Sequence, residues 1–184
     1  EVYEHIVFDG QPHRSLLAHD ELWERSFVVS SFGKTFHATG WKLGYCAAPA
    51  RLSAEFRKIH QFTTFSVSTP MQHGVADFLQ SDPDFYIRLP AFYQKKRDYF
   101  CELLQESRFR LHPARSTFFQ IVDYAEISDT DDVTLAERWT REIGVASIPL
   151  SVFCETPFTG RRLRFCFAKD DATLKDAAAR LCAL

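Results

Sequence analysis

Lys34 is the first side chain in this sequence whose position favours chemistry. It lies directly after Gly33 and close behind the apolar, β-branched segment 26–31, which is predicted to form a buried strand. Burial disfavours the charged form of an amine, and the neutral amine is a nucleophile. Ser31 could donate a hydrogen bond to an anion, and Lys42 could add positive charge to the same anion. On spacing alone, a solvated lysine in a turn is the simpler interpretation.

Arg164 is the second candidate. In the segment 163–167, three apolar residues alternate with Arg164 and a cysteine, so a strand would place the guanidinium on the face opposite the apolar side chains. A guanidinium that is covered on both sides needs an anionic partner, and a carboxylate can bind it through two parallel hydrogen bonds. An edge-strand arginine, in water or in a structural salt bridge, would give the same pattern.

Other kinds of catalytic site find little support in the sequence. The seven histidines do not follow the spacing of metal ligands, so we expect no metal. The five cysteines are widely spaced and form no C-x-x-C pair. The serines lack the G-x-S-x-G setting of a serine hydrolase, and the chain contains no glycine-rich phosphate loop. Lys34 and Arg164 therefore remain the candidates.

Composition narrows the class of protein further. The chain has 184 residues, 22 lysines and arginines, 24 aspartates and glutamates, and a formal net charge of −2. A composition that is 46% hydrophobic and 15% aromatic is typical of a folded chain, not a disordered one. The near-neutral charge excludes a basic nucleic-acid binder, and no run of about 18 apolar residues predicts a membrane span. We expect a cytoplasmic protein without nucleic-acid or membrane partners.

Periodicity and breakers predict two parts. The pattern of residues 1–85 is typical of the last part of a larger domain. The pattern of residues 86–184 predicts a compact α+β unit with helices packed on a small sheet. The joint is the segment 81–84, which contains a proline between two aspartates. The predicted strands cover 26–31, 44–48, 117–122, 145–148 and 162–167. The predicted helices cover 53–61, 70–80, a long amphipathic stretch after 84, a segment capped by Asp131 or Asp132, and a final segment capped by Asp170 or Asp171.

A longer motif gives these candidates a context. Residues 31–45, SFGKTFHATGWKLGY, closely resemble the lysine signature of class I/II aminotransferases, which are fold-type I enzymes that depend on pyridoxal phosphate. The form KTFxxTGWKxG is similar to that of the branch containing kynurenine, glutamine–phenylpyruvate and methionine aminotransferases. The resemblance continues, in order, through 64–70, 148–153 and 163–169, so it covers essentially the whole chain.

The resemblance implies a role for each matching residue. Lys34 would bond covalently to the cofactor aldehyde and then move a proton between the substrate and the cofactor. Tyr3 would donate a hydrogen bond to the phenolic oxygen of the cofactor ring. Ser31 and Lys42 would hold the cofactor phosphate, with Lys42 acting as a point charge where many relatives have an arginine. Arg164 would bind the α-carboxylate of the substrate.

The resemblance also implies what kind of chain this is. The expected fold is α/β and corresponds to the C-terminal part of a fold-type I transferase, with 1–85 as the remainder of the large cofactor-binding domain and 86–184 as the small domain. The family pattern D-x-x-Y places its aspartate immediately before Glu1. We therefore expect about half of the enzyme to lie before residue 1, and the isolated chain to be a poor catalyst. The resemblance also implies a homodimer.

The predicted function is transfer of an amino group between an amino acid, with methionine or a bulky neutral or aromatic side chain, and a 2-oxo acid. One alternative is a cysteine-conjugate β-lyase, because the same cofactor chemistry serves both reactions. A second is the aminotransferase-like domain of a regulator, with a non-catalytic role. A third is a small-domain scaffold without a ligand, in which residues 1–85 would be disordered or misassembled.

Overall fold

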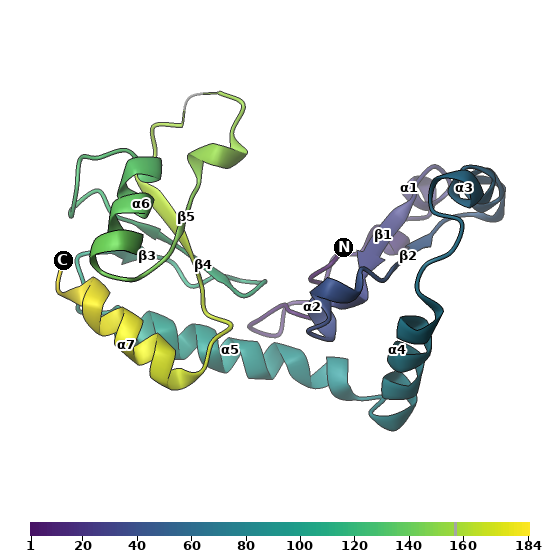
Figure 1. Ribbon diagram of the computed structural model, residues 1–184, viewed down its shortest axis with the longest axis horizontal. Coiled ribbons are helices and arrows are strands. Elements are labelled where there is room, and N and C mark those ends of the chain that lie inside the picture. Colours follow the sequence, from purple (N-terminus) through teal and green to yellow (C-terminus); the bar gives the residue numbers. More distant parts are fainter. Residues whose placement is uncertain (157) are drawn as a thin grey trace. The chain divides into compact units, whose positions relative to one another are not determined.

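The computed structural model describes residues 1–156 and 158–184. The chain divides into two compact units, Glu1–Pro90 and Ala91–Leu184, and each unit is described by itself (Figure 1). The boundary falls inside helix α5 (Phe85–Leu103), which contains Pro90. Among the described residues, no helix is both long and apolar enough to cross a bilayer.

The first unit is built around an antiparallel pair of strands, β1 (Val28–Ser31) and β2 (Gly44–Ala47). Ser31 pairs with Gly44, and Val28 pairs with Ala47. A Cβ at Gly44 would lie 2.5 Å from the carbonyl oxygen of Ser30, so the close approach of the strands requires glycine there. The connection between the strands forms a short helix, α2 (Phe32–Thr35), and a 3₁₀ turn, η2 (Thr39–Trp41).

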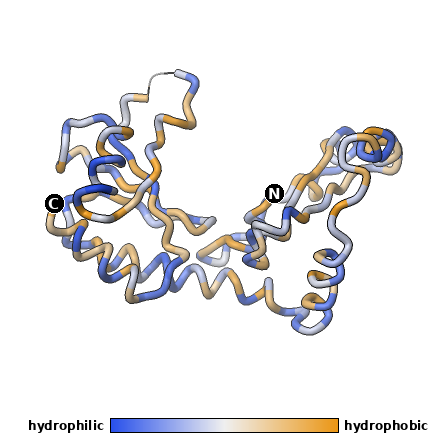
Figure 2. Tube along the Cα trace, in the orientation of Figure 1, coloured by the Kyte–Doolittle hydropathy of each residue, from blue (hydrophilic) through white to orange (hydrophobic). Residues whose placement is uncertain are grey.

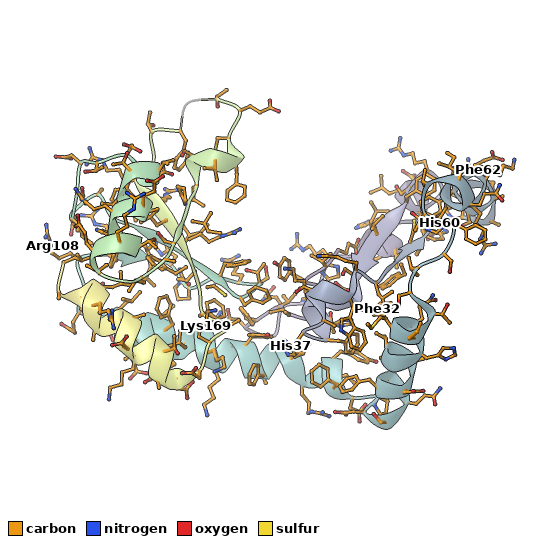
Figure 3. The ribbon with its side chains drawn as sticks, viewed as in Figure 1. Phe32, His37, His60, Phe62, Arg108 and Lys169 are labelled. Carbon is orange, nitrogen blue, oxygen red and sulfur yellow. The ribbon has the colours of Figure 1, made fainter. Side chains whose placement is uncertain are left out.

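Helices make up most of the remainder of the first unit. Proline marks two of the helix starts, since Pro49 precedes α3 and Pro70 occupies the first turn of α4, where its missing N–H has no intrahelical partner to lose. In the described structure, α3 buries none of its residues. Phe62, which is labelled on this helix in Figure 3, has an exposed fraction of 86%. The elements outside the hairpin are η1 (Leu16–Ala18), α1 (Asp20–Trp23), α3 (Ala50–Thr63), α4 (Thr69–Ser81) and the start of α5.

The second unit contains a four-stranded antiparallel sheet in the order β3-β4-β6-β5. The strands are β3 (Arg110–Leu111), β4 (Phe119–Asp123), β5 (Ile148–Pro149) and β6 (Arg162–Cys166). Helix α6 (Asp132–Glu142) is capped by Asp131, whose carboxylate accepts the Thr134 N–H at 2.9 Å. Asp170 caps α7 (Asp171–Cys182) in the same way, through the Thr173 N–H at 2.7 Å.

The core of the second unit lies on one face of this sheet. Leu163 and Phe165 of β6 are 0% and 3% exposed, and the ring of Phe165 lies 6.4 Å from that of Phe100 on α5. The alternate residue, Arg164, points to the opposite face. Hydrophobic residues nevertheless occur along both units, as Figure 2 shows, so burial rather than composition distinguishes them.

Most of the predicted elements are confirmed, with small shifts at their ends. The strand predicted over 145–148 is wrong in extent, because only Ile148 and Pro149 pair with β6. Helix α2 was not predicted, since its four residues are too few to show a period. The predicted joint at 81–84 connects α4 to α5, whereas the two compact units meet after Pro90. The assignment of 1–85 and 86–184 to a large and a small domain stays a prediction.

Candidate active site

Lys34 lies in the short helix α2, directly after β1. Its side chain is half-buried, and its Nζ lies 6.0 Å from the centroid of the Tyr3 ring. The structure therefore brings together two residues that are far apart in the sequence and were both predicted to contact the cofactor. The strand holds the backbone up to Ser31, so the amine is presented from the end of a paired strand.

Ser31 is the N-cap of α2. Its Oγ accepts the Gly33 N–H at 3.0 Å and donates to the carbonyl of Leu43 at 3.2 Å. A hydroxyl has one hydrogen and two acceptor lone pairs. Donation to a phosphate would therefore replace the bond to Leu43, whose carbonyl would keep the Phe32 N–H as a donor at 3.2 Å. Ser31 can make this exchange without leaving a backbone group unsatisfied.

Lys42 lies at the other end of the connection between β1 and β2, and its side chain is exposed. Its φ is +54°, in the left-handed region that residues with a Cβ rarely adopt. The conformation is fixed by the following strand, because Leu43 is 5% exposed and Gly44 pairs with Ser31. A strained backbone held in place by its neighbours is a feature that often accompanies function.

Glu4 is a residue of this region that the sequence analysis did not single out. Its Oε1 accepts a hydrogen bond from Ser30 Oγ at 2.6 Å and a long one from the Tyr45 hydroxyl at 3.4 Å. These contacts tie the segment carrying Tyr3 to both strands of the hairpin. The second oxygen, Oε2, is buried and has no hydrogen-bond partner in the described part of the chain. No local pattern in the sequence could have revealed these contacts, because they join residues more than twenty positions apart.

Glu1 fixes the other side of the same segment. Burial would raise the pKa of its carboxyl group, but hydrogen bonds from His13, the Leu16 N–H and Ser15 outweigh burial and lower the pKa to about 2. Glu1 therefore stays charged at neutral pH and anchors the loop 13–16. His5, whose ring lies 4.7 Å from that of Tyr86, has its pKa lowered by burial.

Arg164 lies in the second unit, on the strand β6 between β4 and β5. It is half-buried, and its guanidinium carbon lies 4.1 Å from the ring centroid of Phe119 and 5.0 Å from that of Phe153. Its Nε is buried and has no hydrogen-bond partner among residues 1–156 and 158–184. A buried charged donor without an acceptor is costly, so this nitrogen is suited to an added anion.

A comparison with known proteins decides the family. The sequence profile of "Aminotransferase class I and II" matches residues 1–181. The chain belongs to the class I/II aminotransferases. The resemblance found in residues 31–45 is thus confirmed, and members of this family use pyridoxal phosphate.

Individual relatives agree with this assignment. Methionine aminotransferase of Escherichia coli is 55% identical over 181 residues, which are 98% of this chain and 47% of that protein. Kynurenine–oxoglutarate transaminase of Dictyostelium discoideum is 34% identical over 198 residues, 96% of this chain and 46% of that protein. The crystal structure of YbdL from E. coli, with a methionine aminotransferase function, matches with a TM-score of 0.95 and 54% identity over 100% of this chain and 49% of that one.

The chain spans about half the length of the relatives it matches. The predicted fold class is confirmed, since the mixed α/β structure matches solved aminotransferases of fold type I over about half of each chain. Within this aminotransferase chain, Tyr3, Ser31, Lys34 and Lys42 lie in the first unit and Arg164 in the second.

The donor set of the first unit fits pyridoxal phosphate. An aldehyde requires an amine, which Lys34 supplies. A phosphate requires a cation and a hydrogen-bond donor, which Lys42 and the Ser31 hydroxyl supply. All three residues lie in one strand–loop–strand segment. His37, which is close to Lys34 in the sequence and is labelled in Figure 3, is exposed. Its ring centroid lies 6.1 Å from that of Phe85 in an edge-to-face arrangement. Within the described ranges, no group of three potential metal ligands occurs.

Proposed function

We propose that this chain takes part in the transfer of an amino group between an amino acid and a 2-oxo acid, with pyridoxal phosphate as cofactor. The observation that carries the proposal is the half-buried Lys34 amine beside Tyr3, in the loop that also holds Ser31 and Lys42. The family assignment supports it. Arg164, with its unpartnered Nε, supplies the group for the substrate.

Four residues of the first unit would hold the cofactor. Lys34 would bind it covalently, Tyr3 would donate a hydrogen bond to its ring oxygen, and Ser31 and Lys42 would bind its phosphate. When bound, pyridoxal phosphate supplies an electron-withdrawing ring that stabilises negative charge developing at the substrate Cα. Lys34 Nζ would accept the proton from the substrate Cα and return it later in the reaction, because its flexible side chain lets the amine move between the two atoms that exchange the proton.

Arg164 would orient the substrate. Its planar guanidinium can donate two parallel hydrogen bonds to an α-carboxylate, which fixes the direction of the Cα–H bond. Ile121 and Ile148 are the cross-strand partners of Arg164 on β4 and β5, and both are about half exposed. Apolar neighbours favour a substrate with an uncharged side chain, and the relative with 55% identity is a methionine aminotransferase. We therefore propose methionine or another bulky neutral amino acid.

Two further parts of the proposal rest on the family assignment alone. We propose a homodimer, because this is typical of the family, and a cytoplasmic location. A cysteine-conjugate β-lyase would use the same residues and is distinguished by its products, pyruvate and ammonia in place of a 2-oxo acid that keeps the donor side chain. A non-catalytic regulator domain would bind the cofactor without turning over any amino acid.

The proposal is tested by reducing the protein with borohydride in the presence of pyridoxal phosphate and locating the added mass by peptide mass spectrometry. We expect the adduct on Lys34 and its loss in Lys34→Ala. Lys42→Ala is the matched control, because it removes a lysine from the same loop and should weaken cofactor binding while keeping the adduct site.

In the full-length enzyme, transamination of methionine should fall by at least about 10³-fold in Lys34→Ala, because covalent binding and proton transfer are lost together. An adduct that persists in Lys34→Ala, or an unchanged rate, would refute the assignment.

A further inference from the structure

Three arginines close together in the sequence make different contacts. Arg161 pairs with Asp129 at 2.5 Å, and Arg162 pairs with Asp123 at 3.8 Å. Arg164 lies instead against the rings of Phe119 and Phe153, at 4.1 Å and 5.0 Å from their centroids. Arg161 and Arg162 thus contact carboxylates, whereas Arg164 contacts aromatic rings.

The rings come from the two sides of the strand that carries Arg164. Phe119 is on β4, where it pairs with Cys166 and lies diagonally across from Arg164. Phe153 lies in the 3₁₀ turn η3 (Ser151–Phe153), which follows β5 on the other side of β6. A guanidinium stacks on aromatic rings through its flat face, and this contact leaves the N–H groups in its plane free to bind a carboxylate.

A buried carboxylate binds the turn that carries Phe153. Asp132 is 5% exposed, and it accepts hydrogen bonds from the Ser151 N–H at 2.8 Å and from Ser151 Oγ at 2.7 Å. These two bonds join the first residue of η3 to the first turn of α6, across nineteen positions of sequence. Phe153 itself is 62% exposed, and its ring lies 5.0 Å from the guanidinium carbon of Arg164.

We propose that Phe119 and Phe153 hold the Arg164 guanidinium in the orientation that binds the substrate carboxylate, and that Asp132 is a positioning residue that acts through Ser151 and Phe153. The inference rests on the proposed function of Arg164. A side chain that is already ordered loses less conformational freedom when its ligand binds, so the ring contacts raise the affinity for the carboxylate without touching it.

The test uses the full-length enzyme loaded with pyridoxal phosphate and two amine ligands, L-methionine and 3-(methylthio)propylamine, which is methionine without its carboxylate. Phe153→Leu keeps an apolar side chain but removes the ring face. We expect it to weaken methionine binding by about three- to tenfold, with kcat changed less than about twofold and the amine bound as before. Phe153→Tyr keeps the ring and should restore methionine binding.

Asp132→Asn should behave as Phe153→Leu does. Its matched control is Asp131→Asn, which removes the same charge from the same helix end but does not contact Ser151. A second measurement does not depend on turnover. The Nε–H and Cδ–H protons of Arg164 should be shifted upfield in NMR spectra by the ring currents, and this shift should decrease in Phe153→Leu and in Asp132→Asn but not in Asp131→Asn.

The outcomes separate this inference from the proposed function. If Arg164→Ala weakens methionine binding but Phe153→Leu and Asp132→Asn do not, Arg164 binds the carboxylate without this support and the inference is wrong. If Phe153→Leu weakens methionine and the amine equally, the ring contacts the substrate directly, which also overturns it. If Arg164→Ala leaves methionine binding unchanged, the proposed role of Arg164 itself fails.

Discussion

The two units differ in how much of their own surface they bury. Sixteen of the twenty-two buried apolar side chains among the described residues belong to the second unit, which closes a core between its sheet and helices. In the first unit, α3 buries nothing, and Phe62 and Phe65 are 86% and 83% exposed. Yet four of the five candidate site residues lie in the first unit. The residues proposed for the cofactor thus lie in the unit with the smaller buried core, where the hydrogen bonds of the hairpin add to the burial of Val28 and Leu43.

Hydrogen exchange would show this difference most strongly. Amide exchange follows local opening, whose free energy is near zero in poorly packed segments and approaches the global value in a core. We expect amides of β4 and β6 to exchange about 10³-fold more slowly than those of α3 in the same sample. Mass spectrometry of the exchanged peptides measures this. Equal protection of α3 and β6 would mean that the first unit is as well packed as the second.

Matched truncations give the next largest effect. Phe165 is 3% exposed and packs between Phe100 and Phe109, so Phe165→Ala should lower the free energy of unfolding by about 3–5 kcal/mol. Phe62→Ala makes the same chemical change at an exposed site of α3 and should alter the free energy of unfolding by less than ~0.5 kcal/mol. Denaturant unfolding measures both. A large loss for Phe62→Ala would show that α3 is packed against something.

A pair of tyrosines tests the polar contacts. Tyr124 is fully buried and donates to the Thr130 carbonyl at 2.9 Å, whereas the hydroxyl of the exposed Tyr45 reaches Glu4 at 3.4 Å. Tyr124→Phe should lower the free energy of unfolding by about 1 kcal/mol, and Tyr45→Phe should have no measurable effect. Denaturant unfolding of the two variants measures both, and equal losses would contradict the distinction.

Tyr124 also predicts a pH dependence. Burial, together with the charges of Asp132 and Asp131, raises the pKa of Tyr124 to about 12. The unfolded state loses this proton near pH 10. The contribution of Tyr124 is therefore complete below pH 10 and is lost as the pH rises from there through 12. Titration of unfolding free energy in the wild type and in Tyr124→Phe checks this, and the two curves should converge at high pH.

The smallest effect concerns the acidic helix caps of the second unit. Hydrogen bonds from Thr134 and Thr173 lower the pKa values of Asp131 and Asp170, so these carboxylates stabilise the folded state above about pH 4 and lose this effect as the pH falls. The melting temperature of Asp131→Asn/Asp170→Asn should decrease less steeply with acid than that of the wild type. Parallel melting curves would contradict this.

The sequence predicted best where a short pattern determines the structure. Alternation located β6, and the aspartate pairs 131–132 and 170–171 located the starts of α6 and α7, where the structure selects Asp131 and Asp170 as the caps. Arg164 lies on the predicted strand β6, whereas Lys34 lies on α2, which was not predicted, and the roles of both residues remain predictions. The contacts of Glu4, Asp132 and Phe153 were not predicted, because they join residues distant in sequence and depend on how the strands and turns pack.

Helix α5 has a gap in its hydrogen-bond ladder at Pro90, the residue where the two units divide. Proline cannot donate to the carbonyl of Tyr86, so one link in the chain of cooperative backbone bonds is absent there. Melting of the first turns of α5 can therefore stop at this point instead of spreading along the helix. The two ends of one helix can therefore unfold separately, each with its own unit. Local unfolding of the cofactor-binding segment then need not reach the sheet that carries Arg164.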